Sequence, residues 1–91
     1  MLKVEKTDQF VLDLEGIVIH IAQDNLIAAA NLEVHIHDQV DRLKEPNFPR
    51  RRGRKTGTLE LVAHPNYVVV LTQTKTVVSA LAIMHVARQY P

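Results

Sequence analysis

The spacing of the apolar residues changes once along this 91-residue chain, and that change limits the folds it can adopt. From Phe10 to Leu43 apolar residues recur every three or four positions, which is the spacing of amphipathic helices. From Gly57 to Met84 they gather in short runs separated by turn residues, which is typical of strands. A helical part followed by a part of strands predicts an α+β domain in which helices cover one face of a sheet.

Two helices are expected in the first part. Thr7 or Asp8 can cap a helix that runs to about Ile21. After a short polar break a second helix is expected over residues 26–45, and Pro46 ends it because the residue before a proline disfavours the helical conformation. The short connection predicts that the two helices pack as an antiparallel hairpin.

Four strands are expected to complete the domain. They cover residues 2–5, Gly57–Ala63, Tyr67–Gln73 and Thr76–Met84. The short turns between the last three predict an antiparallel meander. The expected architecture is a two-layer β-α-α-β-β-β fold, with the N-terminal helical hairpin packed on an antiparallel four-stranded sheet. Residues 1–91 are expected to form a single domain.

Charge is distributed unevenly along the chain. Residues 1–45 carry a net charge of −5 and residues 46–91 a net charge of +6, with histidines counted as neutral. Much of the positive charge lies in PNFPRRRGRKT, residues 46–56, which is expected to be a loop. Its basic residues are Arg50, Arg51, Arg52, Arg54 and Lys55. The cluster suits a phosphate-bearing or acidic partner; a solvated loop, or attraction between the two halves of the chain, would also account for it.

The composition argues against several other kinds of site. The chain has no cysteine, so disulfides and thiolate zinc sites are excluded. His35 and His37 lie two positions apart on a helix and therefore on different faces, and we expect no metal and no cofactor. The longest apolar runs are too short to span a bilayer. The first residues lack the apolar core of a signal peptide, and we expect a cytoplasmic protein without membrane contact.

The C-terminal residues hold a second candidate site. The last expected strand leads into His85, and Arg88 and Tyr90 follow within five positions. A histidine, an arginine and a tyrosine together suit general acid–base work on RNA. The alternative is structural, with His85 at the sheet edge and Tyr90 packed as a terminal aromatic residue. The sequence contains no arrangement typical of a Ser/His/Asp or two-carboxylate mechanism.

Five segments, in this order, carry a family resemblance. They are DLEGIVIHIAQDN (13–25), AAANLEVHIHDQVDRL (28–43), GRKTGTLELV (53–62), HPNYVVVL (64–71) and MHVARQYP (84–91). In these segments the chain resembles the RelE/ParE superfamily of toxins from bacterial type II toxin–antitoxin pairs, and it looks closer to the ParE branch. The resemblance covers nearly the whole chain.

The resemblance implies a ParE-like toxin of the plasmid-stabilisation type. Such a toxin inhibits DNA gyrase by protein–protein binding, without catalytic residues, and forms a hetero-oligomer with a cognate antitoxin that neutralises it. The implied target surface combines the basic loop, Arg50–Arg52, Arg54 and Lys55, with the C-terminal residues His85, Arg88, Gln89 and Tyr90. Two alternatives remain: a RelE-like ribosome-dependent mRNA endonuclease using His85, Arg88 and Tyr90, or a non-toxic relative that still binds antitoxin.

Two positions depart from the family pattern. The family often has arginine where this chain has Leu59 and tyrosine where it has Leu71. The expected effect is to remove a positive charge and a hydroxyl from the sheet, which bears on whether toxicity is retained. Apolar residues also occupy strand positions where a nuclease would place charged groups, which favours a toxin that acts by binding.

Overall fold

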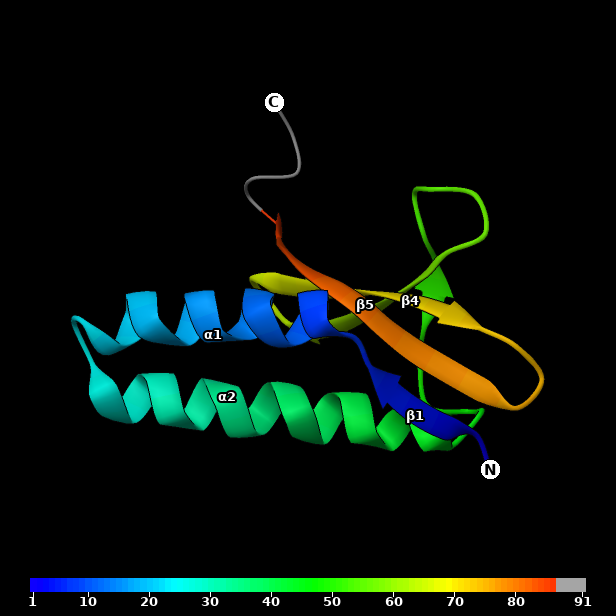
Figure 1. The fold of residues 1–91 in the computed structure, drawn as a ribbon, viewed down its shortest axis with the longest axis horizontal. Coiled ribbons are helices and arrows are strands. Elements are labelled where there is room, and N and C mark those ends of the chain that lie inside the picture. The colour runs from blue at the N-terminus through cyan, green and yellow to red at the C-terminus, as the bar shows by residue number, and fades with distance from the viewer. Residues whose placement is uncertain (87–91) are drawn as a thin grey trace.

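The computed structural model describes residues 1–86. Two helices cover one face of a five-stranded sheet (Figure 1). The elements are β1 (Lys3–Lys6), α1 (Asp8–Ala22), α2 (Leu26–Asp41), a 3₁₀ turn (Arg42–Lys44), β2 (Arg51–Arg52), β3 (Leu59–His64), β4 (Tyr67–Gln73) and β5 (Val77–His85). The expected α+β class, the helical hairpin and the three-stranded meander are confirmed. Neither helix in residues 1–86 is long and apolar enough to cross a membrane.

Polar side chains fix the start of each helix. The Thr7 hydroxyl accepts a hydrogen bond from the Phe10 amide, 3.1 Å away, and donates one to the Leu81 carbonyl at 2.9 Å. It therefore caps α1 and also ties that end of the helix to β5. The Asn25 side chain accepts from the Ala28 amide at 2.9 Å and caps α2. The second helix ends earlier than expected, and its last turn tightens into the 3₁₀ turn before Pro46.

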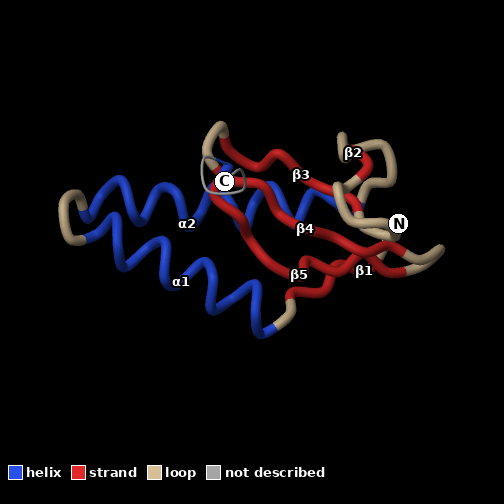
Figure 2. The backbone as a smooth tube through the Cα atoms, turned by 90° about the horizontal axis from the view of Figure 1, so that it is seen from above, coloured by secondary structure: helices blue, strands red, loops and turns tan. Residues whose placement is uncertain are grey.

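The strand order is β1-β5-β4-β3-β2, which differs from the expected sheet in two respects (Figure 2). First, β1 pairs in parallel with β5, from Lys3 opposite Val77 to Lys6 opposite Ala80. The chain between these two strands contains the helical hairpin and also β2, β3 and β4, which gives the long connection that a parallel pair requires. Because the other strand pairs are antiparallel, the sheet is mixed. Second, Arg51 and Arg52 lie within the segment expected to be a loop, but they form a short fifth strand beside β3.

Glycines allow the chain to fold back between β2 and β3. The Gly53 amide donates to the Thr58 carbonyl at 2.8 Å. A Cβ atom at Gly53 would lie 2.1 Å from the Thr58 hydroxyl oxygen, so a larger residue there would force the turn apart. Gly57 has φ of +86°, a conformation that glycine adopts without strain. The turn thus depends on both glycines.

The core lies between the hairpin and the covered face of the sheet. The helices and the 3₁₀ turn contribute the buried side chains of Phe10, Leu14, Leu32, Ile36, Val40 and Leu43, and the strands contribute Leu61, Ala63, Val69, Leu71, Val78, Ala80 and Ile83. Because side chains alternate along a strand, Glu60 and Val62 point to the opposite face of the sheet. The helices leave this second face uncovered, and we call it the open face.

A histidine links the hairpin to β1. The Lys6 ammonium donates to Nδ1 of His37 at 3.0 Å and pairs with Asp41 at 2.8 Å, and the rings of His37 and Phe10 meet edge to face. Burial lowers the pKa of His37 below its ordinary value of 6.5, and the charge of Lys6 lowers it further. The negative charges of Asp41 and Glu33 act in the opposite direction and offset part of this lowering of the pKa. The folded protein therefore favours the neutral imidazole.

This lowered pKa predicts a pH-dependent stability. The unfolded chain binds a proton at His37 near pH 6.5, whereas the folded protein binds it only at lower pH, so stability should fall as the pH drops below about 6.5 towards the folded pKa. Thermal denaturation at constant ionic strength measures the effect. His37→Gln, which keeps an acceptor for Lys6, should lose less melting temperature over this range. Equal losses in both proteins would assign the pH dependence to other groups.

Candidate functional site

The five basic residues of the candidate site lie on one projecting element, residues 50–60, which we call the basic hairpin. It consists of β2, the glycine turn and the start of β3 (Figure 1). All five belong to this element, but their side chains have different surroundings. Some of these side chains form contacts that hold the basic hairpin together, and the others are available to bind a partner.

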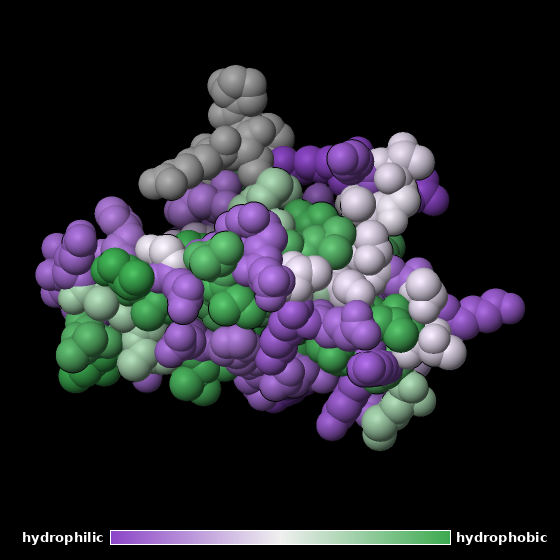
Figure 3. Space-filling model, in the orientation of Figure 1, coloured by the Kyte–Doolittle hydropathy of each residue, from purple (hydrophilic) through white to green (hydrophobic). Residues whose placement is uncertain are grey.

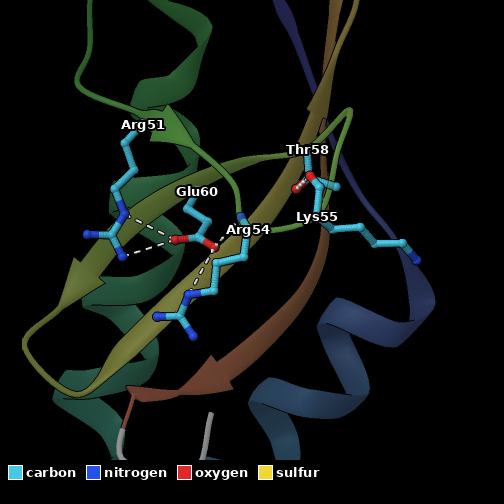
Figure 4. A network of polar contacts seen from close by, with 5 residues as sticks. All are labelled: Arg51, Arg54, Lys55, Thr58 and Glu60. Carbon is cyan, nitrogen blue, oxygen red and sulfur yellow. Dashed lines mark hydrogen bonds and ion pairs between the residues drawn. The ribbon is translucent and has the colours of Figure 1, made fainter. Parts of the chain in front are cut away.

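Glu60 is the centre of the basic hairpin. It is an acidic residue on the open face, with only 3% of its surface exposed. Its Oε1 accepts from Arg51 through Nη2 at 3.0 Å and Nε at 3.1 Å (Figure 4). Its Oε2 accepts from the Arg54 amide at 3.3 Å and lies 4.0 Å from Nε of Arg54. The buried carboxylate thus holds the Arg51 side chain and the Arg54 backbone, and the Arg54 guanidinium lies near it.

Arg50 has a structural role in this arrangement. Its guanidinium donates to the backbone carbonyls of Phe48, Leu43 and Glu45, and to the Gln73 side chain at 2.9 Å. These bonds join the end of the 3₁₀ turn, the hairpin and the end of β4. Burial lowers the pKa of Arg50, in keeping with a side chain that is partly withdrawn from water. Substitution of Arg50 would therefore disturb the fold as well as any binding surface.

Arg52 and Lys55 are exposed like Arg51 and Arg54, but they differ from those two in their contacts. Neither side chain makes a hydrogen bond or ion pair with another described residue. Arg52 neighbours Arg51 on a strand, so the two side chains point to opposite faces. In Figure 4 the Lys55 side chain extends away from Glu60. These two residues are the ones best placed to contact a partner.

His85 lies in a second group, a chain of aromatic rings that we call the ring cluster. Its members come from α2, β3, β4 and β5 and are His35, His64, Tyr67 and His85. Neighbouring ring centroids are 6.3, 5.6 and 5.1 Å apart in that order. The His35 Nε2–H donates to the Ala63 carbonyl at 2.7 Å, at a point where the pairing of β3 with β4 is irregular. Sequence reasoning identified the histidines singly and missed Tyr67.

A cleft of about 630 Å³ opens beside the ring cluster. It lies between α1 and the ends of β4 and β5, and its lining includes Asp13, Gly16, His20, Tyr67, Ile83 and His85. Asp13 links the two walls of the cleft, since its carboxylate accepts a hydrogen bond from the Ile83 amide at 2.9 Å.

Among residues 1–86, no three histidine, aspartate or glutamate side chains are arranged to hold a metal ion.

The basic hairpin and His85 lie at opposite ends of the sheet. Leu59, at the base of the hairpin, pairs with Leu71, which pairs with Ala80, whereas His85 pairs with Tyr67 at the other end. His85 lies five positions after Ala80 along β5, a separation on the order of 17 Å. The structure does not bring these two parts of the expected surface together. The other expected site residues, Arg88, Gln89 and Tyr90, lie outside the described residues.

The two departures from the family pattern fall in the core rather than on the open face. Leu71 is fully buried and Leu59 packs against the same cluster. The effect of these two departures on toxicity stays a prediction. Leu71 contributes to the packing of the sheet against the hairpin.

Three solved structures have a similar fold. The chain is similar to a chain of the chromosomal ParDE toxin–antitoxin system of P. aeruginosa, with a TM-score of 0.83 and 20% identity over 94% of this chain and 97% of that one. It is also similar to YafQ of E. coli, with a TM-score of 0.57 and 14% identity over the whole of both chains. A chain of the E. coli DinJ–YafQ toxin–antitoxin complex gives a TM-score of 0.53 and 12% identity, over 99% of this chain and 98% of that one.

The sequence itself decides the family. The model of the ParE toxin of the parDE type II toxin–antitoxin system matches residues 4–90. The chain therefore belongs to the ParE toxin family. A search of curated proteins gives no match.

Proposed function

We propose that this ParE-family toxin inhibits DNA gyrase by binding it, and that a cognate antitoxin neutralises it in a hetero-oligomer in the cytoplasm. The main support for this proposal is that the chain belongs to the ParE toxin family. The basic hairpin supports it, because Glu60 holds Arg51 and Arg54 in place while Arg52 and Lys55 stay exposed. A hairpin set rigidly before binding loses little conformational entropy when it meets its target.

The helical hairpin offers a surface for the antitoxin. Its far end projects beyond the sheet, and apolar residues gather there (Figures 1 and 3). Ile19, Leu26 and Ile27 flank the connection between the helices, and 63% to 74% of their surface is exposed. Apolar residues that gather on a protein surface are typical of protein interaction sites. An amphipathic antitoxin segment would cover them.

Supercoiling of relaxed plasmid by purified gyrase tests the proposal. The intact toxin should inhibit the reaction, and added antitoxin should restore it. A variant lacking residues 87–91, with β5 left complete, should inhibit less because Arg88, Gln89 and Tyr90 belong to the proposed target surface. If the intact, folded toxin leaves supercoiling unchanged at saturating concentration, gyrase is not the target.

The ring cluster favours a second candidate, a ribosome-dependent mRNA endonuclease. Tyr67 and His85 line the cleft with rings 5.1 Å apart, and His64 follows at 5.6 Å from Tyr67. Imidazole and phenol groups at such spacing suit proton transfer on RNA. Cleavage of mRNA on translating ribosomes, lost in His85→Gln, would favour this candidate. Inactivity in both assays with antitoxin binding retained would indicate a non-toxic relative.

A further inference from the structure

A second cleft, of about 490 Å³, is formed by the turn of the basic hairpin and the end of β4. It is lined by Arg52, Gly53, Arg54, Thr56 and Thr58, with Gln73 from β4. No acidic residue is among the residues that line it. The cleft is therefore lined by cationic and hydroxyl groups. It is separate from the ring cluster and from the surface proposed for the antitoxin.

The walls of this cleft are fixed by short hydrogen bonds. The Gly53 amide donates to the Thr58 carbonyl at 2.8 Å, and the Thr58 hydroxyl donates to the Lys55 carbonyl at 2.6 Å. Glu60 holds the Arg54 backbone amide from the other side. The turn is therefore ordered before any ligand arrives, which lowers the entropic cost of binding.

The charges in the cleft favour an anion. Glu60 already satisfies the guanidinium of Arg51 and contacts Arg54. Arg52 lines the cleft, is exposed and has no side-chain partner among the described residues. Lys55 extends from the same turn (Figure 4). A second anion, in addition to Glu60, would complete the charge balance of the hairpin.

We propose that this cleft binds a phosphate group of a DNA backbone, with the Arg52 guanidinium as the principal donor and Thr56 and Arg54 beside it. A phosphate presents oxygens in several directions and so matches donors placed around a cleft. Lys55, on the same turn, would meet a neighbouring phosphate. The inference deepens the proposed function and rests on it, since gyrase acts on DNA and a toxin bound there would meet the duplex.

Fluorescence anisotropy with a short labelled DNA duplex, and no gyrase, tests the inference. Arg52→Ala should weaken binding about tenfold and make the salt dependence shallower by about one counterion. Lys3→Ala is the matched control, because it removes the same charge from the opposite edge of the sheet and its pairing with Glu5 is exposed. It should leave the salt slope unchanged.

Three results would overturn the inference. The first is an equal loss of affinity in the two variants, which would indicate attraction to overall charge. The second is binding of an acidic peptide such as oligoglutamate without binding of DNA, which would assign the cleft to a protein partner. The third is gyrase inhibition by a toxin that does not bind DNA, which would leave the proposed function intact and remove only the phosphate site.

Discussion

Replacement of Phe10 by alanine is expected to lower the free energy of unfolding by about 3–5 kcal/mol. The Phe10 ring is fully buried between α1, α2 and the sheet, and it contacts the ring of His37. Removing it leaves a cavity where the hairpin meets the strands. A domain of this size has about 5–15 kcal/mol of stability, so the loss is a large part of the total. Urea denaturation measures it from the change in midpoint.

Leu12→Ala is the control for this prediction. Leu12 lies on the same helix with 60% of its surface exposed, and its truncation should change stability by no more than about 0.5 kcal/mol. Similar losses in the two variants would mean that Phe10 does not join the two layers of the fold. The Phe10 variant should also lose gyrase inhibition in proportion to the fraction of protein that is unfolded.

Replacement of Glu60 by alanine is expected to cost about 2 kcal/mol of stability and, in addition, to weaken gyrase inhibition. The carboxylate is buried, but Arg51 and Arg54 are partly exposed and can return to water, which limits the cost. Without Glu60 the basic hairpin loses the group that holds two arginines in place. Thermal denaturation and the supercoiling assay, at a temperature where the variant is folded, measure the two effects separately.

Glu15→Ala gives the matched comparison for Glu60. Glu15 is an exposed acid on α1, and its removal changes the net charge by the same amount. If both variants inhibit gyrase equally, the arginine positions set by Glu60 have no part in target binding. If Glu60→Ala inhibits as well as the parent while losing stability, the carboxylate serves only the fold.

The parts of the fold that local pattern encodes were predictable. The apolar stripe of α1 and the cap at Thr7 predicted the first helix. The short turns predicted the antiparallel order of β3, β4 and β5. The partner of β1 was not predictable, because pairing with β5 depends on contacts far apart in the sequence. Strand β2 was missed because two adjacent arginines show no apolar alternation.

The candidate site was predictable only as a set of residue types. Sequence identified the arginines of the basic hairpin, but not that Arg50 binds backbone carbonyls or that Glu60 lies between two others. Those roles depend on which side chains a turn brings together. Tyr67 was missed for the same reason, since its neighbours in the ring cluster come from other elements. The one local signal was the sequence HPNY, which places His64 and Tyr67 on either side of a tight turn.

The parallel pairing of β1 with β5 also affects when the protein can complete its fold during synthesis. Thr7 bonds to Leu81 across 74 positions, and β1 finds its only neighbour in the last strand of the described chain. During synthesis the helical hairpin therefore emerges before the strands that cover it, with its core-facing side chains exposed. The domain closes only after β5 has left the ribosome, and contacts of such high sequence separation form slowly. Between synthesis and closure, the core-facing side chains of the helical hairpin are therefore accessible to other proteins.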